Sequence, residues 1–188
     1  MMTAMMLPAV WPWLRLFGAM APRAWPGRRA GPVRAQFAAG YFAVWGAYSV
    51  AAAGLQSGLH ELALLRADLT LGATAAGAVL LAAGLFQLTP MKDACLKHCR
   101  NRLGFFLERW HDGPAGPFRM GARHGAFCVA CCWALMLLAL VLGVMNLLWM
   151  AALTAMVVAE QRAPRARHLR QVLGIALGAW GLVLLLRP

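Results

Sequence analysis

The sequence has few charged residues, and acidic side chains are the scarcest among them. Of 188 residues only 13% are charged and six are Asp or Glu, whereas 62% are apolar. A soluble domain of this length could not cover its surface with so few charges. The composition therefore excludes an ordinary soluble globular protein and predicts an integral membrane protein with an all-α fold.

The sequence also lacks the motifs that point to catalysis. It contains no phosphate-binding loop of the Walker type and no Ser/His/Asp set, and its apolar segments carry no paired carboxylates of the kind that drive proton-coupled pumps. Its first residues have neither the basic segment nor the small-residue cleavage site of a secretory signal. The sequence therefore gives no positive sign of an enzyme.

Long apolar runs predict where the membrane helices lie. A helix needs about 20 apolar residues to cross a bilayer, and such runs recur along residues 1–188, which we interpret as one polytopic helix bundle. The expected spans are 1–14 (a partial one), 36–57, 69–88, 125–142, 146–160 and 171–186. An amphipathic segment near 91–110 is expected to lie along the cytoplasmic membrane surface.

The apolar stretch 125–160 is divided into a hairpin because it is too long for one span. As a single helix it would be ~54 Å long at ~1.5 Å per residue, against a hydrocarbon core of about 30 Å. The segment Gly143-Val-Met-Asn146 lies near its middle and offers residues suited to a tight turn. With the hairpin, the sequence predicts six helical segments in all.

The basic residues are concentrated in three of the predicted loops. Residues 15–34, 91–124 and 161–170 hold 5, 7 and 4 Lys or Arg, which is 16 of the 18. The hairpin places all three loops on one side of the membrane, and cytoplasmic loops of membrane proteins carry an excess of Lys and Arg. We therefore interpret the net charge of +12 as the orientation signal of an inner-membrane protein, with the lipid bilayer as its partner and no nucleic acid.

All five cysteines lie at the predicted cytoplasmic membrane boundary, in two groups that each include a histidine. The groups are Cys95, His98 and Cys99, and His124, Cys128, Cys131 and Cys132. Residues three or four apart share one face of a helix, so each group can present two thiolates and an imidazole. The cytoplasm keeps thiols reduced, and thiolates with imidazole suit zinc or monovalent copper. We predict one metal site between the two groups, with copper as the best-suited metal and zinc as the alternative.

Methionines form a second set of soft donors. Met5, Met6 and Met145 fall on the opposite side of the membrane in the predicted topology. Thioethers bind monovalent copper, so this second metal site would be an entry point that feeds the cysteines. The alternative interpretation is that these methionines pack within apolar helices and bind no metal.

Two other functions stay open at this point. Cys128-Val-Ala-Cys131 has the spacing of disulfide-exchange motifs, which favours a thiol–disulfide relay, although the motif faces the reducing side. The chain could also be an accessory or structural subunit of a larger membrane metalloenzyme complex, in which the cysteines serve to pack. Its protein partners would be other membrane subunits or a metallochaperone.

Three stretches around the cysteines and Asn146 carry a family resemblance. They are Leu85-Phe-Gln-Leu-Thr-Pro-Met-Lys-Asp-Ala-Cys-Leu-Lys-His-Cys99, Arg119-Met-Gly-Ala-Arg-His-Gly-Ala-Phe-Cys-Val-Ala-Cys-Cys-Trp-Ala-Leu-Met136 and Gly143-Val-Met-Asn-Leu-Leu-Trp-Met150. Together they resemble DUF2182, a family of bacterial membrane proteins predicted to bind metal. Met1-Met-Thr-Ala-Met-Met-Leu-Pro8 is similar to the methionine-rich N-terminal segment of that family.

The resemblance covers nearly the whole chain and implies metal binding by the cysteines and histidines of both groups. It implies a lesser role for Met5, Met6, Met145 and Asn146. Members of the family usually carry further residues before the methionine-rich segment. We therefore expect that the first helix of this chain is truncated or that its start is misassigned.

Overall fold

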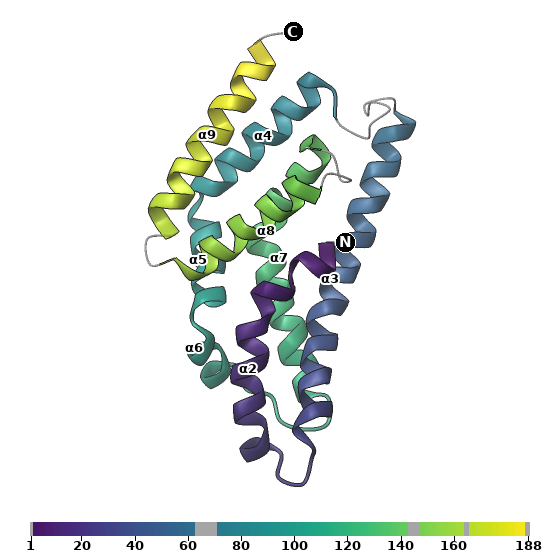
Figure 1. Ribbon diagram of the computed structural model, residues 1–188, viewed down its shortest axis with the longest axis vertical. Coiled ribbons are helices and arrows are strands. Elements are labelled where there is room, and N and C mark those ends of the chain that lie inside the picture. The colour runs from purple at the N-terminus through teal and green to yellow at the C-terminus, as the bar shows by residue number, and fades with distance from the viewer. Residues whose placement is uncertain (1, 63–70, 143–146, 164–165, 187–188) are drawn as a thin grey trace. The chain divides into compact units, whose positions relative to one another are not determined.

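The computed structural model describes residues 2–62, 71–142, 147–163 and 166–186, and the nine elements assigned within these ranges are all α-helices. In chain order they are α1 (Met2–Met5), α2 (Leu7–Ala24), α3 (Ala30–Glu61), α4 (Ala73–Leu88), α5 (Pro90–Arg100), α6 (Arg102–Glu108), α7 (Gly116–Leu142), α8 (Leu147–Arg162) and α9 (Ala166–Leu186) (Figure 1). The predicted all-α fold is confirmed.

Three of these helices are long and apolar enough to cross a membrane. Their candidate spans are Ala30–Glu61, Gly116–Ala139 and Arg167–Leu186, with mean hydropathies of 1.2, 1.5 and 1.8. Helices α4 and α5 add a fourth if the bent pair counts as one span. The 16 residues of α8 fall short of the roughly 20 residues of a usual span. These helices agree with a membrane protein, while the number of crossings stays a prediction.

Helix α2 continues through residues that the sequence predicts to be a loop. The basic loop was expected from residue 15 onward, but α2 runs to Ala24. The reason is its buried face, since Val10, Trp13, Phe17 and Ala21 recur every three or four residues, as one side of a helix does. Burial of this face outweighs the prolines within the helix.

The predicted amphipathic segment near 91–110 consists of two helices, α5 and α6. They are separated at Asn101, whose side-chain oxygen accepts a hydrogen bond of 3.0 Å from the Gly104 nitrogen and so caps α6. Before α5, the chain bends by 66° between α4 and α5. Pro90 causes this bend because it disfavours helical backbone at Thr89, which has an extended ψ of 146°.

The chain divides into two compact units, and three helices contribute to both. The first unit is Met1–Ser49 with Ala94–Ala130, and the second is Val50–Asp93 with Cys131–Pro188. Helices α3, α5 and α7 each continue from one unit into the other. The single membrane domain over 1–188 stays a prediction.

The first unit is built around aromatic side chains on α2 and α3. Trp13, Phe17, Phe37, Tyr41 and Trp45 are each at most 1% exposed. The three on α3 are four residues apart, so they form one stripe along that helix. The rings of Phe17 and Phe37 stack with centroids 4.8 Å apart. The two helices therefore pack through aromatic faces.

Helix α7 approaches α3 so closely that glycine is needed at the contact. A Cβ atom at Gly121 would collide with the carbonyl oxygen of Phe37, and one at Gly40 would collide with that of Phe118. Small residues allow helix backbones to approach each other in this way. The contact fixes the register of α7 on α3 and thus sets which α7 side chains face Tyr41.

In the second unit, α4 and α9 lie side by side and meet through glycines (Figure 1). A Cβ atom at Gly84 would lie 2.5 Å from the Gly178 nitrogen and 2.7 Å from the Gly174 carbonyl oxygen. Such distances leave no room for a side chain. The backbones of α4 and α9 are therefore in direct contact at this point.

We expect Gly84→Ala to lower the free energy of unfolding by about 1–3 kcal/mol, the usual cost of overpacking a tight contact. The control is Gly178→Ala on the facing helix, because a Cβ atom there meets no other atom within 4 Å. Thermal unfolding in detergent, followed by circular dichroism, compares the two variants. Equal stability of both would contradict the close packing.

Candidate functional site

The upstream group of predicted metal ligands lies on α5. Cys99 is buried with 3% exposed, while Cys95 and His98 are half-buried. The His98 ring stacks on Phe127 of α7, with centroids 4.5 Å apart and planes at 2°. Within the first unit, this ring contact holds the α5 turn with His98 against the α7 turn that precedes Cys128.

Both ring nitrogens of His98 already have partners. Nδ1 lies 2.9 Å from the Ala94 carbonyl oxygen and donates to it, and Nε2 accepts from the Arg109 guanidinium at 3.4 Å. That guanidinium also lies over the Phe127 ring, 5.2 Å from its centroid. In this arrangement His98 holds α5 in place, and it could bind a metal only after Arg109 moves away.

The downstream group begins with His124 and Cys128, one turn apart on α7 and both buried, with 3% and 1% exposed. Trp13 stacks on His124 with ring centroids 3.7 Å apart, and Tyr41 stacks on it at 5.3 Å. The Tyr41 hydroxyl also lies 3.3 Å from the Cys128 sulfur, a hydrogen bond in which either atom can donate. Tyr41 thus contacts both predicted ligands.

These surroundings suit a soft cation. One sulfur and one imidazole lie among the aromatic rings of Trp13, Tyr41 and Phe105. A thiolate at Cys128 would accept a hydrogen bond from the Tyr41 hydroxyl. Thiolate and imidazole donors in apolar surroundings match the preferences of monovalent copper.

The other predicted ligands on α1, at the N-cap of α2 and on α7 are divided between the two units. Cys131 and Cys132 are buried on the next turn of α7 and belong to the second unit, while Met5 and Met6 are buried at the start of the first. All five cysteines are thiols. Met145 and Asn146 lie outside the described residues.

A metal site closed by three or more of these side chains stays a prediction. Over residues 2–62, 71–142, 147–163 and 166–186, no group of three or more His, Cys, Asp or Glu is arranged to hold a metal ion. Within the first unit, Tyr41 connects two of the predicted ligands, since its ring stacks on His124 and its hydroxyl contacts the Cys128 sulfur.

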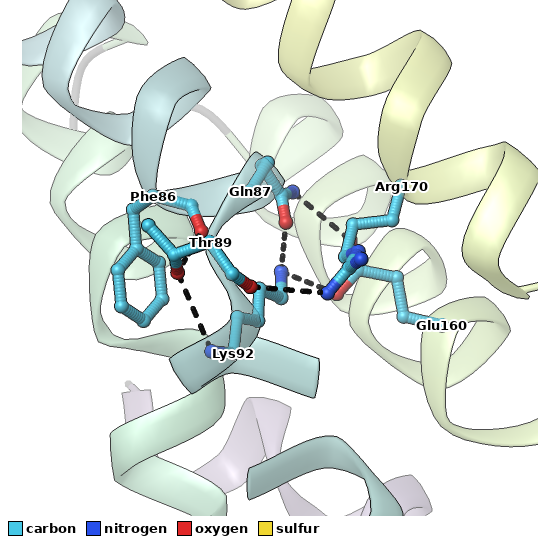
Figure 2. Close-up of polar contacts among 6 residues, drawn as sticks. All are labelled: Phe86, Gln87, Thr89, Lys92, Glu160 and Arg170. Carbon is cyan, nitrogen blue, oxygen red and sulfur yellow. Dashed lines mark hydrogen bonds and ion pairs between the residues drawn. The ribbon is translucent and has the colours of Figure 1, made fainter. Parts of the chain in front are cut away.

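The second unit contains a buried ion-pair network that the sequence did not reveal. Lys92 Nζ lies 2.7 Å from Glu160 Oε2, and these side chains are 0% and 3% exposed. Gln87 joins both, because its amide nitrogen donates to Glu160 Oε1 at 2.9 Å and its amide oxygen accepts from Lys92 (Figure 2). The three side chains form a closed set in which each charge has a partner.

A second ion pair lies beside the first, at the bend between α4 and α5. Arg170 of α9, 3% exposed, donates to Asp93 at 2.7 Å and to the Thr89 carbonyl oxygen at 3.5 Å. The Thr89 hydroxyl donates to the Phe86 carbonyl oxygen and accepts from the Lys92 nitrogen (Figure 2). Residues of α8 and α9 therefore fix the first turn of α5.

Sequence patterns gave little sign of this network. Glu160 lies at the end of the expected span 146–160, where a solvated charge is ordinary, and Lys92 belongs to a basic loop. The one available signal is scarcity, since Asp93 and Glu160 are two of only six acidic residues and both lie near the end of an apolar segment. Ionisable groups at the edge of membrane segments usually face a partner within the protein.

Comparison with known protein families gives a match that extends over almost the whole chain. Residues 1–184 match the PpoB2 family, which is described as a copper chaperone. No protein of curated function and no solved structure matches the chain. The family description agrees with copper as the predicted metal and gives no support to zinc.

Proposed function

Since the chain belongs to the PpoB2 copper chaperone family, we propose that it binds monovalent copper within the bacterial inner membrane and delivers it to a partner protein. Copper is here the cargo and not a resident cofactor. The observation that carries this proposal is the buried pair His124 and Cys128, with the Tyr41 hydroxyl 3.3 Å from the sulfur. Thiolate and imidazole are donors that copper prefers.

The remaining cysteines extend this pair into a set of exchange partners. Cys131 and Cys132 follow Cys128 along α7, and Cys95 and Cys99 lie on α5. Delivery requires that copper pass from one donor to the next. Several soft donors would shorten the distance that copper moves in each transfer. His98 would join only when Arg109 releases its Nε2. Met5, Met6 and Met145 would supply thioether donors at the entry side.

The finer parts of the assignment belong to the same proposal. The basic loops and the cysteines would face the cytoplasm, because 16 of the 18 Lys and Arg lie in three loops. The resemblance to DUF2182 fits a metal-binding membrane protein and stays a prediction. The thiol–disulfide relay and the accessory-subunit role also stay predictions. A metallochaperone or a membrane-bound copper enzyme would be the protein partner.

Replacing Cys128 tests the proposal most directly. We expect Cys128→Ser to weaken binding of monovalent copper about 100-fold, because removing a ligand costs at least as much as removing a residue that supports one. The measurement is a competition titration of the purified full chain in detergent against a chelator of known affinity. His168→Asn is the control, since that histidine is exposed on α9. Unchanged affinity in Cys128→Ser would contradict the proposal.

Tyr41→Phe tests whether the hydroxyl supports the sulfur. Removing only the oxygen keeps the ring stacked on His124 but deletes the hydrogen bond to Cys128. We expect the copper affinity to fall by about 10-fold, as is usual when a residue that supports a ligand is lost. The same titration measures it, with Tyr48→Phe as the control. Equal losses in both variants would argue against this role of Tyr41.

A further inference from the structure

An apolar groove lies between α8 and α9 in the second unit. Its volume is about 130 Å³, and its walls include Trp149, Leu153, Met156, Leu173, Leu177 and Trp180. An apolar protein cavity of about 150 Å³ stays free of water and binds benzene. The groove therefore has the size and the character to take several methylene groups of a hydrocarbon chain.

The groove begins about two turns from a basic end of the same helix pair. Arg162 stands in the last turn of α8, Arg167 and His168 stand in the first turn of α9, and all three are exposed. Arg162 is six residues from Met156, and Arg167 is six residues from Leu173, about 9 Å along each helix. Because a short connection joins α8 to α9, these charges lie at one end of the groove.

The acidic side chains near this end do not cancel the positive charge. Glu160 is paired with the buried Lys92, and Asp93 is paired with Arg170. Arg162 and Arg167 therefore make the surface at this end of the apolar groove positively charged. Basic residues at a membrane boundary attract anionic lipids, and basic pockets between membrane helices bind phosphate headgroups.

We propose that this groove is a binding site for an anionic phospholipid. The phosphate lies at Arg162 and Arg167, and one acyl chain fills the groove toward Trp149 and Trp180. The arrangement follows the bilayer, with the headgroup at the boundary and the chain pointing inward. The site is independent of copper, because every residue in it belongs to α4, α7, α8 or α9 and none is a predicted ligand.

Native mass spectrometry of the full chain in detergent tests the proposal, with phosphatidylglycerol and phosphatidylcholine of identical acyl chains as probes. We expect the wild-type chain to retain phosphatidylglycerol with about tenfold higher affinity, because two basic residues near the surface favour an anionic headgroup. Arg162→Gln/Arg167→Gln should lower phosphatidylglycerol retention to the level of phosphatidylcholine. Arg28→Gln/Arg29→Gln, which removes two exposed arginines from the first unit, should retain the preference.

A second variant tests the groove itself. Ala152→Phe places a ring where the acyl chain would lie and should reduce retention of both lipids. Equal retention of the two lipids by the wild-type chain would overturn the proposal, and so would an unchanged preference in Arg162→Gln/Arg167→Gln. A lipid-free dimer that disappears in Ala152→Phe would instead assign the groove to a second copy of the chain and would also overturn it.

Discussion

Lys92→Met is expected to lower the free energy of unfolding by about 3–5 kcal/mol, the usual cost of removing one partner of a buried ion pair. The loss follows from Glu160, whose carboxylate would stay buried at 3% exposure without the ammonium group 2.7 Å away. Methionine has about the length of the lysine side chain, so the change removes charge and little volume. Thermal unfolding in detergent, followed by circular dichroism, measures the effect.

A second substitution separates the charge effect from packing. Lys92→Met/Glu160→Gln removes both charges, and the amide left at position 160 can still accept from Gln87. We expect most of the lost stability to return, because replacing both members of a buried pair is often close to neutral. Lys97→Met on the exposed side of α5 is the control and should change stability by less than about 0.5 kcal/mol. If Lys92→Met were as stable as the wild-type chain, the ion pair of Lys92 and Glu160 would not stabilise the bend between α4 and α5.

Trp13→Ala is expected to destabilise the first unit by about 3–5 kcal/mol, the range for removing a buried aromatic side chain. Trp13 is 1% exposed and packs on His124, Phe105 and Phe106. Trp11→Ala is a matched control, because that tryptophan lies on the same helix and is 60% exposed. A shift of the unfolding temperature in Trp13→Ala alone is the expected result.

The same pair of variants tests the copper site that we propose at His124 and Cys128. With Trp13 gone, the His124 ring loses the surface that holds it at a centroid distance of 3.7 Å. We therefore expect weaker copper binding in Trp13→Ala, measured below its unfolding temperature, and unchanged binding in Trp11→Ala. Loss of stability with intact affinity would show that the tryptophan supports the fold and not the ligand.

Much of the helical fold could be predicted from the sequence because apolar runs are a local signal. The runs near 69–88, 125–142 and 171–186 correspond to α4, α7 and α9, and their length reflects the thickness of a bilayer. The end of α2 was missed for a physical reason. Pro12 and Arg15 suggest a break, whereas the burial of Phe17 and Ala21, which continues the helix, depends on tertiary contacts.

The candidate site was predictable in its donor types but not in its geometry. The spacing of His124 and Cys128 places both on one face of a helix, and in the structure both are buried and contact Tyr41. The sequence around these two residues does not reveal that Tyr41 and Trp13 contact them, because both aromatic residues are distant in the chain. The network of Lys92 and Glu160 was missed for the same reason, since the partners of a buried charge are chosen by packing.

The glycine contact between α3 and α7 affects how the proposed copper site responds to substitutions. Where two backbones touch, as Gly121 touches the carbonyl of Phe37, the spacing of the helices is set by main-chain atoms. Side-chain rotations elsewhere in the first unit then have little influence on the gap between the Tyr41 hydroxyl and the Cys128 sulfur. The position of the donor pair relative to Tyr41 is therefore set by contacts between main-chain atoms. Substitutions can therefore change the aromatic side chains around the donors more readily than the spacing between α3 and α7.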